Sequence, residues 1–539
     1  MLFLQLNLLL MNYPSIFNDV LGPVMRGPSS SHCAASLRIG RICRDLMDGK
    51  IENVLIEYDP MGSLATTHKS QGSDMGLFGG FLGYEADDER LVDYQKGIKA
   101  AGIQIKIEIT DIQEPHPNTY KIHLFNASES HEVVALSLGG GMIEVIRMDG
   151  ADVSMAGDFC ETLIYTSQPD EIADYLTQTI EYDEIFIGRG HKPFVEVKSQ
   201  TFLPEVIEQE LIAMESVEAV KKLNPVLPVM SRKGLSVPFI TAEEMLSFNQ
   251  EKNLSLWELA LEYESQRGNI SREEVFEKMR NLVRIMQKSI DYGLLGTRFK
   301  DRILGPQSMN FQAGMNNKTL IESAVLNQII LYVSAMMEVK SAMGVIIAAP
   351  TAGACGALPG AVLGAVSALK LSEDDAIRAM LAAGMIGVFI AAHATFAAEV
   401  GGCQAECGSG SGMAAAAIVT LGGGNLNQSL AAASMALQNS LGMICDPVAN
   451  RVEAPCLGKN IMAASNALSM ANLALADYDH LIPLDEVIDA MDKVGKSIAH
   501  ELRCTGFGGL SATPTARAIE ARLEGEEGLN EAARRFKIC

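Results

Sequence analysis

Alanine, glycine and serine crowd the stretch between residues 341 and 475, where β-branched runs are few. Apolar residues recur at helical spacing from Thr241 onward. The segment TAEEML places Glu244 three positions after Thr241, a signal of a helix N-terminus. Small side chains allow helix backbones to approach closely, so this part of the chain predicts a tightly packed all-α domain. Pro, Ser, Thr and Cys interrupt its long apolar stretches, and we interpret them as buried helices rather than membrane spans.

The chain before residue 241 has a different pattern. The β-rich runs VLIEYD, IQIKIEIT, KIHLFN and EVVALSL alternate with glycine-rich turns, including one at residues 139–141, which indicates an α+β domain. From about residue 156 a strand (TLIYTS), a helix (PDEIADYLTQTI), a second strand (EIFIG) and a long helix ending near Leu223 are expected. These elements form a small α/β unit of the size of a regulatory module. The proline-rich NPVLPVMSRKGLSVP predicts a linker.

Charge and cysteine content restrict the partners and the compartment. Lys and Arg total 43 against 66 Asp and Glu, a formal net charge of −23, so neither nucleic acid nor a membrane is an expected partner. The first ten residues, MLFLQLNLLL, lack a basic flank and a cleavage site, and we interpret them as a non-structural leader before Met11. Without a secretory signal, the ten cysteines indicate a reducing, cytoplasmic location.

Three cysteines stand beside Gly or Pro in stretches where a regular helix is improbable. Cys403 lies in AEVGGCQAECGSGSG, and Cys445 and Cys456 bound the segment CDPVANRVEAPC. Iron–sulfur clusters take cysteine thiolates, normally four, and a cluster that activates a substrate needs one iron left open. Three protein ligands suit that chemistry. Spacing alone leaves open the alternative that these cysteines are packing residues, because free cysteines often only fill space in a core.

Three polar segments are candidates for substrate contacts. In APTAGACGALPG, Thr351, Ala352 and Gly353 lie between two prolines, where free backbone amides can bind a carboxylate, although such a loop can be a plain connector. The segment GPSSSHC carries hydroxyls and an imidazole beside an expected helix N-terminus, and TTHKSQGSD is a second polar cluster. Both segments can equally be capped or solvated loops.

The stretches APTAGACG, EVGGCQAE and LGMICDPVANRVEAPC, in the C-terminal part, resemble the signatures of the iron–sulfur-dependent L-serine dehydratases. Residues 16–41 resemble the opening of that family's other domain, so a single chain with fused α and β portions is implied. The resemblance runs from about residue 16 to about residue 520. It implies a multidomain fold with an α+β N-terminal domain, a small ACT-like α/β module and an all-α C-terminal catalytic domain. The expected divisions are a leader at 1–10, the α+β domain at 11–155, the ACT-like module at 156–230, a linker at 231–240, the catalytic domain at 241–525 and a tail at 526–539.

The resemblance also implies the site and its chemistry. A [4Fe–4S] cluster on Cys403, Cys445 and Cys456 would act as a Lewis acid and dehydrate L-serine to pyruvate and ammonia, without pyridoxal phosphate. Carboxylate binding falls to the loop Thr351, Ala352 and Gly353. His32 is the expected base, since an imidazole titrates near neutral pH. Further substrate contacts are expected from Ser29, Ser30, Ser31, His68 and Lys69.

The sequence departs from the family pattern at several positions, so alternatives stay open. Cys33 replaces a usual threonine, Gln71 a histidine and Cys504 a glutamate. L-Threonine dehydration or L-cysteine desulfidation on the same scaffold is therefore an alternative, and a cluster-based amino-acid sensor is a minor one. Cys539 is a candidate fourth ligand at rest. The resemblance further implies an oxygen-sensitive homodimer that serves amino-acid degradation and gluconeogenesis.

Overall fold

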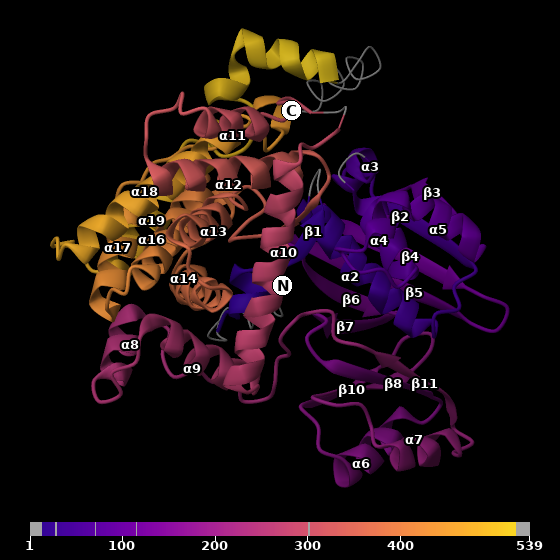
Figure 1. The fold of residues 1–539 in the computed structure, drawn as a ribbon. Coiled ribbons are helices and arrows are strands. Elements are labelled where there is room, and N and C mark those ends of the chain that lie inside the picture. Colours follow the sequence, from indigo (N-terminus) through magenta and orange to yellow (C-terminus); the bar gives the residue numbers. More distant parts are fainter. Residues whose placement is uncertain (1–12, 27–29, 70–71, 115, 300–301, 524–539) are drawn as a thin grey trace. The chain divides into compact units, whose positions relative to one another are not determined.

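The computed structural model describes residues 13–523 apart from 27–29, 70–71, 115 and 300–301 (Figure 1). The chain forms two compact units, one from Met1–Gly22 together with Ser236–Cys539 and the other from Pro23–Leu235. The boundary between Leu235 and Ser236 falls in the segment predicted as a linker. The predicted leader at 1–10 and tail at 526–539 lie outside the described residues.

The N-terminal unit contains a six-stranded sheet in the order β3-β2-β4-β5-β6-β7. Its strands are β2 (Asn53–Tyr58), β3 (Gln104–Ile109), β4 (Thr119–Phe125), β5 (Ser130–Gly139), β6 (Met142–Met148) and β7 (Ala151–Met155). Only β2 and β3 pair in parallel among them. In β2, Val54, Ile56 and Tyr58 alternate toward the core, as the period of a half-buried strand requires. The four β-rich runs and the glycine turn at 139–141 are confirmed.

Helices of the N-terminal unit contribute to the core of this sheet. A short strand, β1 (Val24–Arg26), precedes α2 (Ser30–Leu46), which packs against α4 (Ser73–Phe81); α3 (Leu64–Thr67) and α5 (Tyr94–Ala101) complete the set. A Cβ added to Gly80 would lie 2.7 Å from the Cα of Gly40. The two helices therefore touch through their backbones, and glycine is required at this crossing.

A second sheet in the same unit has the order β11-β8-β10-β9. Its chain order is β8 (Cys160–Thr166), α6 (Pro169–Thr179), β9 (Glu184–Gly188), β10 (Phe194–Ser199), α7 (Glu205–Ile212) and β11 (Val217–Leu223). This is a βαββαβ arrangement of the ferredoxin-like type. The long helix expected to end near Leu223 is wrong. The segment that was expected to be one long helix is instead divided into α7 and β11. β11 is a strand because it completes the hydrogen bonding of the fully buried β8.

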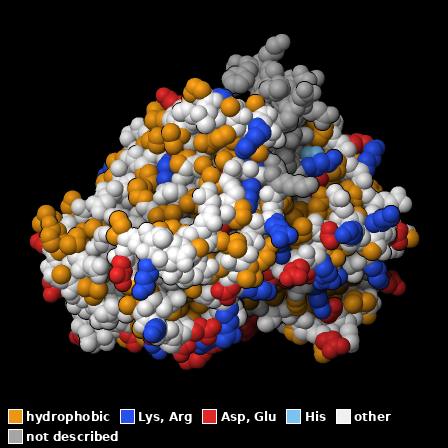
Figure 2. Space-filling view, turned by 45° about the horizontal axis from the view of Figure 1, so that its top comes forward, with side chains coloured by type: hydrophobic (Ala, Val, Ile, Leu, Met, Phe, Trp, Pro, Cys, Tyr) orange, Lys and Arg blue, Asp and Glu red, His pale blue; other side chains and the backbone are white. Residues whose placement is uncertain are grey.

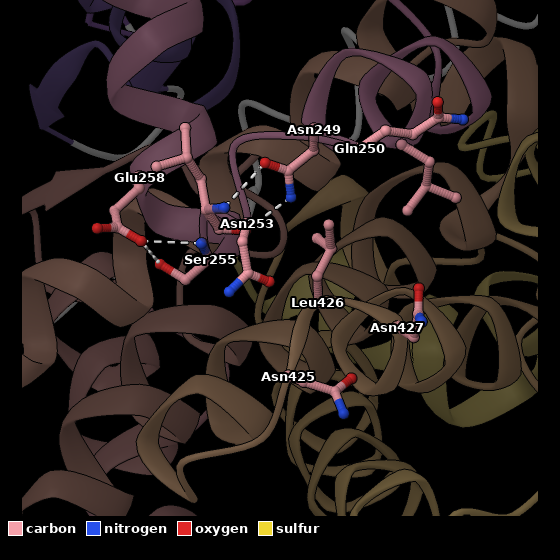
Figure 3. Close-up of a pocket in the computed structure, with 10 residues that line it drawn as sticks. Asn249, Gln250, Asn253, Ser255, Glu258, Asn425, Leu426 and Asn427 are labelled. Carbon is pink, nitrogen blue, oxygen red and sulfur yellow. Dashed lines mark hydrogen bonds between the residues drawn. The ribbon is translucent and has the colours of Figure 1, made fainter.

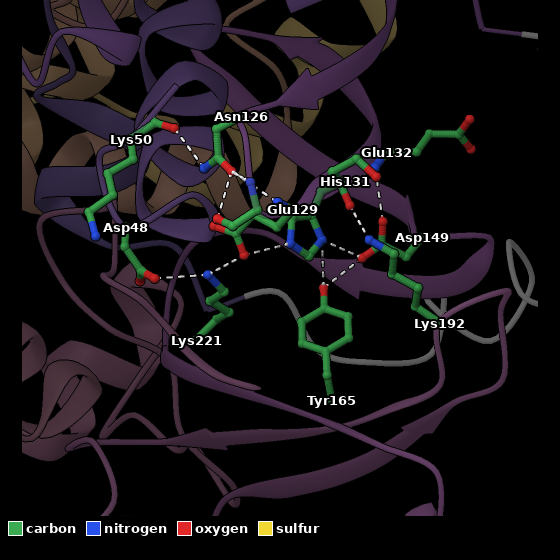
Figure 4. A network of polar contacts seen from close by, with 12 residues as sticks. Asp48, Lys50, Asn126, Glu129, His131, Glu132, Asp149, Tyr165, Lys192 and Lys221 are labelled. Carbon is green, nitrogen blue, oxygen red and sulfur yellow. Dashed lines mark hydrogen bonds and ion pairs between the residues drawn. The ribbon is translucent and has the colours of Figure 1, made fainter. Parts of the chain in front are cut away.

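Buried polar groups join the two sheets of the N-terminal unit (Figure 4). Asp149 accepts from Tyr165 Oη at 2.7 Å and lies 2.6 Å from His131 Nδ1. Lys221 on β11 bridges Glu129 at 2.6 Å and Asp48 at 2.8 Å. Burial opposes ionisation of Asp149, but its hydrogen bonds outweigh burial and hold the pKa below the ordinary value. The network fixes β8 and β11 to the six-stranded sheet.

The C-terminal unit is mostly helical. Its helices are α8 (Ala242–Asn249), α9 (Leu256–Gly268), α10 (Arg272–Leu294), α11 (Ser308–Asn316), α12 (Ala324–Ser341), α13 (Ala357–Leu369), α14 (Glu373–His393), α15 (Ala398–Gly401), α16 (Ser409–Leu421), α17 (Leu426–Gln438), α18 (Cys456–Leu475) and α19 (Leu484–Ser497), with one short strand, β12 (Val345–Ile347). The predicted N-terminus of α8 is confirmed, since Thr241 Oγ1 accepts from the amide of Glu244. α16 packs against α13, α14, α17 and α18 and is buried over residues 409–419, so the prediction of closely approaching small-residue helices is confirmed.

Residues 13–22 pack with the helical unit rather than with the α+β domain that was expected to begin at residue 11. The segment η2 (Ile16–Val20) lies on α14, where glycines at 384 and 387 leave room for Ile16 and Val20. The buried carboxylate of Glu264 accepts from Ser15 Oγ at 2.5 Å and from the amide of Ile16 at 2.8 Å. These contacts hold the segment in the helical core.

Helix α14 is the one helix in the described part of the chain that is long and apolar enough to cross a membrane. Its most apolar stretch is 78% buried within the fold. Core burial accounts for its hydropathy. On the face shown in Figure 2, basic and acidic side chains occur side by side.

Candidate active site

Two of the three predicted cysteine ligands stand at the ends of helices in the C-terminal unit, and the third lies in a loop. Cys403 precedes a single π-helical turn, η4 (Gln404–Gly408), and follows Gly402, whose φ is +70°. Cys456 is the first residue of α18. Cys445 lies in a loop, where its amide donates to the carbonyl of Leu502 at 2.8 Å and its carbonyl accepts from the amide of Cys504 at 2.8 Å. The predicted positions at helix edges are confirmed for Cys403 and Cys456.

The cysteines gather into one buried group. Cys403, Cys407 and Cys445 are 3%, 1% and 4% exposed and belong to the same packed cluster, against which Cys504 also packs. Cys456 is 7% exposed and begins the helix that borders this cluster. Cys407, four residues after Cys403, also places its thiol within this group.

Asn460 joins the cysteine group to the glycine-rich loop. It lies one turn after Cys456 on α18, and its Nδ2 donates to the carbonyl of Gly353 at 2.9 Å and to the sulfur of Cys407 at 3.6 Å. Its Oδ1 accepts from the amides of Gly356 and Ala357 at the start of α13. One fully buried side chain therefore holds the loop, the start of α13 and the cysteine helix together.

Three of these thiols, at Cys407, Cys445 and Cys456, are poor acids in this environment. Burial raises the pKa of Cys456 to about 12. The neighbouring Cys504 thiol and burial raise the pKa of Cys445, while the Cys403 thiol and burial raise the pKa of Cys407. The thiolate form of these cysteines needs stabilisation by positive charge, and a metal that binds sulfur would supply that charge.

The donors that this group offers are cysteine thiols from separate chain segments, and iron–sulfur clusters are held by thiolates. Across the described residues, no three His, Cys, Asp or Glu side chains are already placed to hold one metal ion. Lys340, 3% exposed, lies nearby, and burial lowers its pKa.

The predicted carboxylate loop is held from both sides. The hydroxyl of Thr351 accepts from the amide of Ala354 at 3.2 Å and donates to Glu406 Oε1 at 2.7 Å. Among the described residues, the amides of Ala352 and Gly353 donate to no protein group. These two amides can donate hydrogen bonds to a ligand carboxylate, the role that the sequence predicted for this loop.

Glu406 is a site residue that sequence reasoning missed. It lies on η4 between the cysteine group and the loop, and burial raises the pKa of its carboxyl to about 7. A Cβ on Gly353 would lie 2.9 Å from the carboxyl carbon of Glu406, so the carboxylate occupies the space that glycine leaves. The available signal was that Glu406 is the one charged residue from Gly401 to Leu421.

The remaining predicted residues belong to the N-terminal unit. His32 lies in the first turn of α2, and burial lowers its pKa, so its imidazole is neutral at pH 7. His68 Nδ1 lies 2.8 Å from Asp74 Oδ1, and Lys69 is exposed. Ser29 and the side chains of Ser30 and Ser31 lie outside the described residues, as do Gln71 and Cys539.

Cys33 is buried where two helices of the N-terminal unit cross. Its thiol is fully buried in the N-terminal unit, and burial raises its pKa to about 12. The backbone carbonyl of Cys33 faces Gly76 where α2 crosses α4. This cysteine packs at a helix crossing, and its influence on substrate specificity stays a prediction.

A surface hollow elsewhere in the C-terminal unit is lined by the ends of three helices (Figure 3). Four of its polar residues make local hydrogen bonds at the helix ends. Asn249 exchanges hydrogen bonds with Leu254, the Ser255 amide and hydroxyl donate to Glu258, and the Asn425 amide donates to Gln428.

The region that carries the buried thiol group and the amide-lined loop matches a known class of enzymes. The family profile "Serine dehydratase alpha chain" matches residues 251–511. The probable L-serine dehydratase alpha chain of Bacillus subtilis is 38% identical over 287 residues, 53% of this chain and 96% of that one. The beta chain of the same organism is 37% identical over 154 residues, 29% of this chain and 69% of that one.

A single-chain relative is similar to both regions, the one that matches the alpha chain and the one that matches the beta chain. L-serine dehydratase 1 of Escherichia coli is 27% identical over 501 residues, which cover 90% of this chain and 96% of that one. The chain belongs to the L-serine dehydratase family, a family of ammonia-lyases, in its single-chain form.

Proposed function

We propose that this chain converts L-serine to pyruvate and ammonia with a [4Fe–4S] cluster on Cys403, Cys445 and Cys456. The observation that carries the proposal is the convergence of buried thiols from separate segments next to a loop with free amides. Family membership supports L-serine as the substrate, and the relatives' names state that activity for them.

When bound, the cluster would supply Lewis acidity toward the substrate hydroxyl, which makes hydroxide a better leaving group. The protein residues would orient the substrate and move protons. The amides of Ala352 and Gly353 would bind the carboxylate. His32, neutral at pH 7, would take the α-proton, with Ser29, Ser30, Ser31, His68 and Lys69 as further contacts. The enamine that leaves would hydrolyse to pyruvate and ammonia.

Cys504 is a thiol beside the proposed cluster ligands. Its position supports a cluster with one open iron and a neighbouring group that substrate can displace. It packs against the cysteine group without belonging to the three predicted ligands, and it is half-exposed. Cys539 stays a proposed fourth ligand at rest. Replacing each cysteine separately and comparing the cluster spectra would assign the ligands.

The βαββαβ module is proposed to be the ACT-like regulatory module of this enzyme. The support is its topology and its firm attachment to the six-stranded sheet. Turnover measured with and without added amino acids other than substrate would test regulation.

The setting is proposed to be the cytoplasm, with the enzyme an oxygen-sensitive homodimer in amino-acid degradation and gluconeogenesis. The nine described cysteines are free thiols, which suits a reducing compartment. Hydrophobic side chains at the turn between α18 and α19, among them Leu481 at 81% exposure, suit a subunit contact. Light scattering of the anaerobic protein would measure the oligomeric state.

The decisive experiment is anaerobic purification followed by iron and sulfide analysis, cluster absorbance and pyruvate release from L-serine, L-threonine and L-cysteine. We expect a cluster and preferential turnover of L-serine. Cys403→Ser should lose absorbance and turnover together. Cys160→Ser is the matched control, because this buried thiol already donates to the Gln200 carbonyl in the other unit and should leave both unchanged. Turnover without a cluster would refute the mechanism, and turnover of another substrate alone would refute the specificity.

A further inference from the structure

Glu406 is a half-buried carboxylate without a cationic partner in direct contact. Its Oε1 accepts from the Thr351 hydroxyl at 2.7 Å, and within the described residues no other group donates to it. No ion pair of Glu406 occurs among those residues, although Lys340 and Lys459 influence it from farther away. The proposed mechanism leaves this side chain without a role.

The position of Glu406 is unfavourable for binding an anion alone. The carboxyl carbon would lie 2.9 Å from a Cβ on Gly353, so it borders the amides that receive the substrate carboxylate. Two carboxylates this close repel each other. A ligand that carries a positive charge next to its own carboxylate removes that repulsion.

An α-amino acid has this arrangement, because its ammonium and its carboxylate are bonded to the same carbon atom. The amides of Ala352 and Gly353 match the carboxylate, and the Glu406 carboxylate beside them matches the ammonium. The hydrogen bond from Thr351 fixes Glu406 Oε1 and leaves its Oε2 for the ligand. Burial raises the pKa of Glu406 to about 7.

We propose that Glu406 binds the α-ammonium group of the substrate and so selects amino acids over acids that lack an amino group. This inference rests on the proposed function, because it requires the loop at Thr351 to bind the substrate carboxylate. The charged and titratable groups that face Glu406 from neighbouring elements are Glu399 on α15, Lys340 on α12, Lys459 and Cys456 on α18, and the thiols of Cys355, Cys407 and Cys445.

The test uses two unreactive ligands that differ only in the ammonium group. L-Alanine and propionate share the carboxylate and the carbon skeleton, and neither has a hydroxyl to eliminate. Binding is measured by calorimetry on the anaerobic holoenzyme. We expect the wild type to prefer L-alanine, and Glu406→Gln to weaken L-alanine about 10- to 100-fold, the effect of losing a charge-assisted hydrogen bond. The same variant should bind propionate as well as or better than the wild type, because a repulsive charge is removed.

Glu399→Gln is the matched control, because it removes an exposed carboxylate of the same region and should leave the preference unchanged. Cluster absorbance shows that Glu406→Gln is loaded. If that variant does not fold, Glu406→Asp keeps the charge and should keep a reduced preference for L-alanine.

The outcomes separate this inference from the proposed function. Equal weakening of both ligands in Glu406→Gln, or an unchanged preference, would overturn the ammonium role while serine turnover by the wild type still supports the proposed function. Loss of turnover with unchanged L-alanine binding would assign Glu406 to proton transfer instead. A wild type that binds neither ligand and releases no pyruvate would overturn both.

Discussion

Asn460 donates to the carbonyl oxygen of Gly353 across 2.9 Å, and the side chain is fully buried. The residue comes from the helix that begins at Cys456, so this hydrogen bond couples a proposed cluster ligand to the proposed carboxylate loop. The same carboxamide caps the amides of Gly356 and Ala357. A buried donor and acceptor in one side chain thereby define the geometry of the site.

Asn460→Ala should destabilise the helical unit and disturb the site together. Removing the carboxamide leaves buried amides without a partner, which costs about 2 kcal/mol or more. Denaturant unfolding followed by circular dichroism measures that loss, and the KM for L-serine should rise as the loop loosens. Asn472→Ala is the control, since this exposed residue lies on the same helix. A variant as stable as the control would show that the loop is held by other contacts.

Gly353→Ala should impair substrate binding with little effect on stability. The new methyl group would meet the Glu406 carboxylate, which can swing away because it is the end of a flexible side chain. The displaced carboxylate should raise the KM for L-serine about tenfold. Steady-state kinetics measures the effect. Gly458→Ala, in open space on α18, is the control and should be neutral or slightly stabilising. An unchanged KM in Gly353→Ala would contradict the proposed position of the substrate.

Glu196→Gln should stabilise the N-terminal unit above about pH 5 and reduce the pH dependence of its stability. Burial raises the pKa of Glu196 from 4.5 to about 7, so between these values the folded state binds a proton that the unfolded state has released. The stability contributed by that proton is fully present below pH 4.5 and is lost as pH rises toward 7, by on the order of 1 kcal/mol per pH unit.

Glu161 is a buried acidic neighbour of Glu196, and burial raises the pKa of Glu161 as well. Lys198 forms an ion pair with Glu196. Unfolding free energies measured from pH 5 to 8 give the slope for wild type and variant. Glu218→Gln, an exposed change on β11, should retain the wild-type slope. A variant slope equal to that of the wild type would show that Glu196 is ionised throughout.

The sequence by itself determined the elements whose signals are local. The alternation in VLIEYD gave β2, and the Thr241–Glu244 pair gave the start of α8. Placement of Cys403 and Cys456 at helix ends also followed from flanking Gly and Pro, which interrupt helical hydrogen bonding. The family could be recognised from short motifs for the same reason, since each motif is contiguous.

Only the tertiary structure decided the features that depend on distant partners. The segment at 217–223, with helix-favouring Glu, Ala and Lys, became β11 because pairing with the buried β8 outweighs local propensity. Residues 15–20 joined the helical unit because Glu264, far along the chain, accepts their donors. Glu406 gained its place in the site because Thr351, 55 residues earlier, donates to it, and no local pattern encodes a contact of that length.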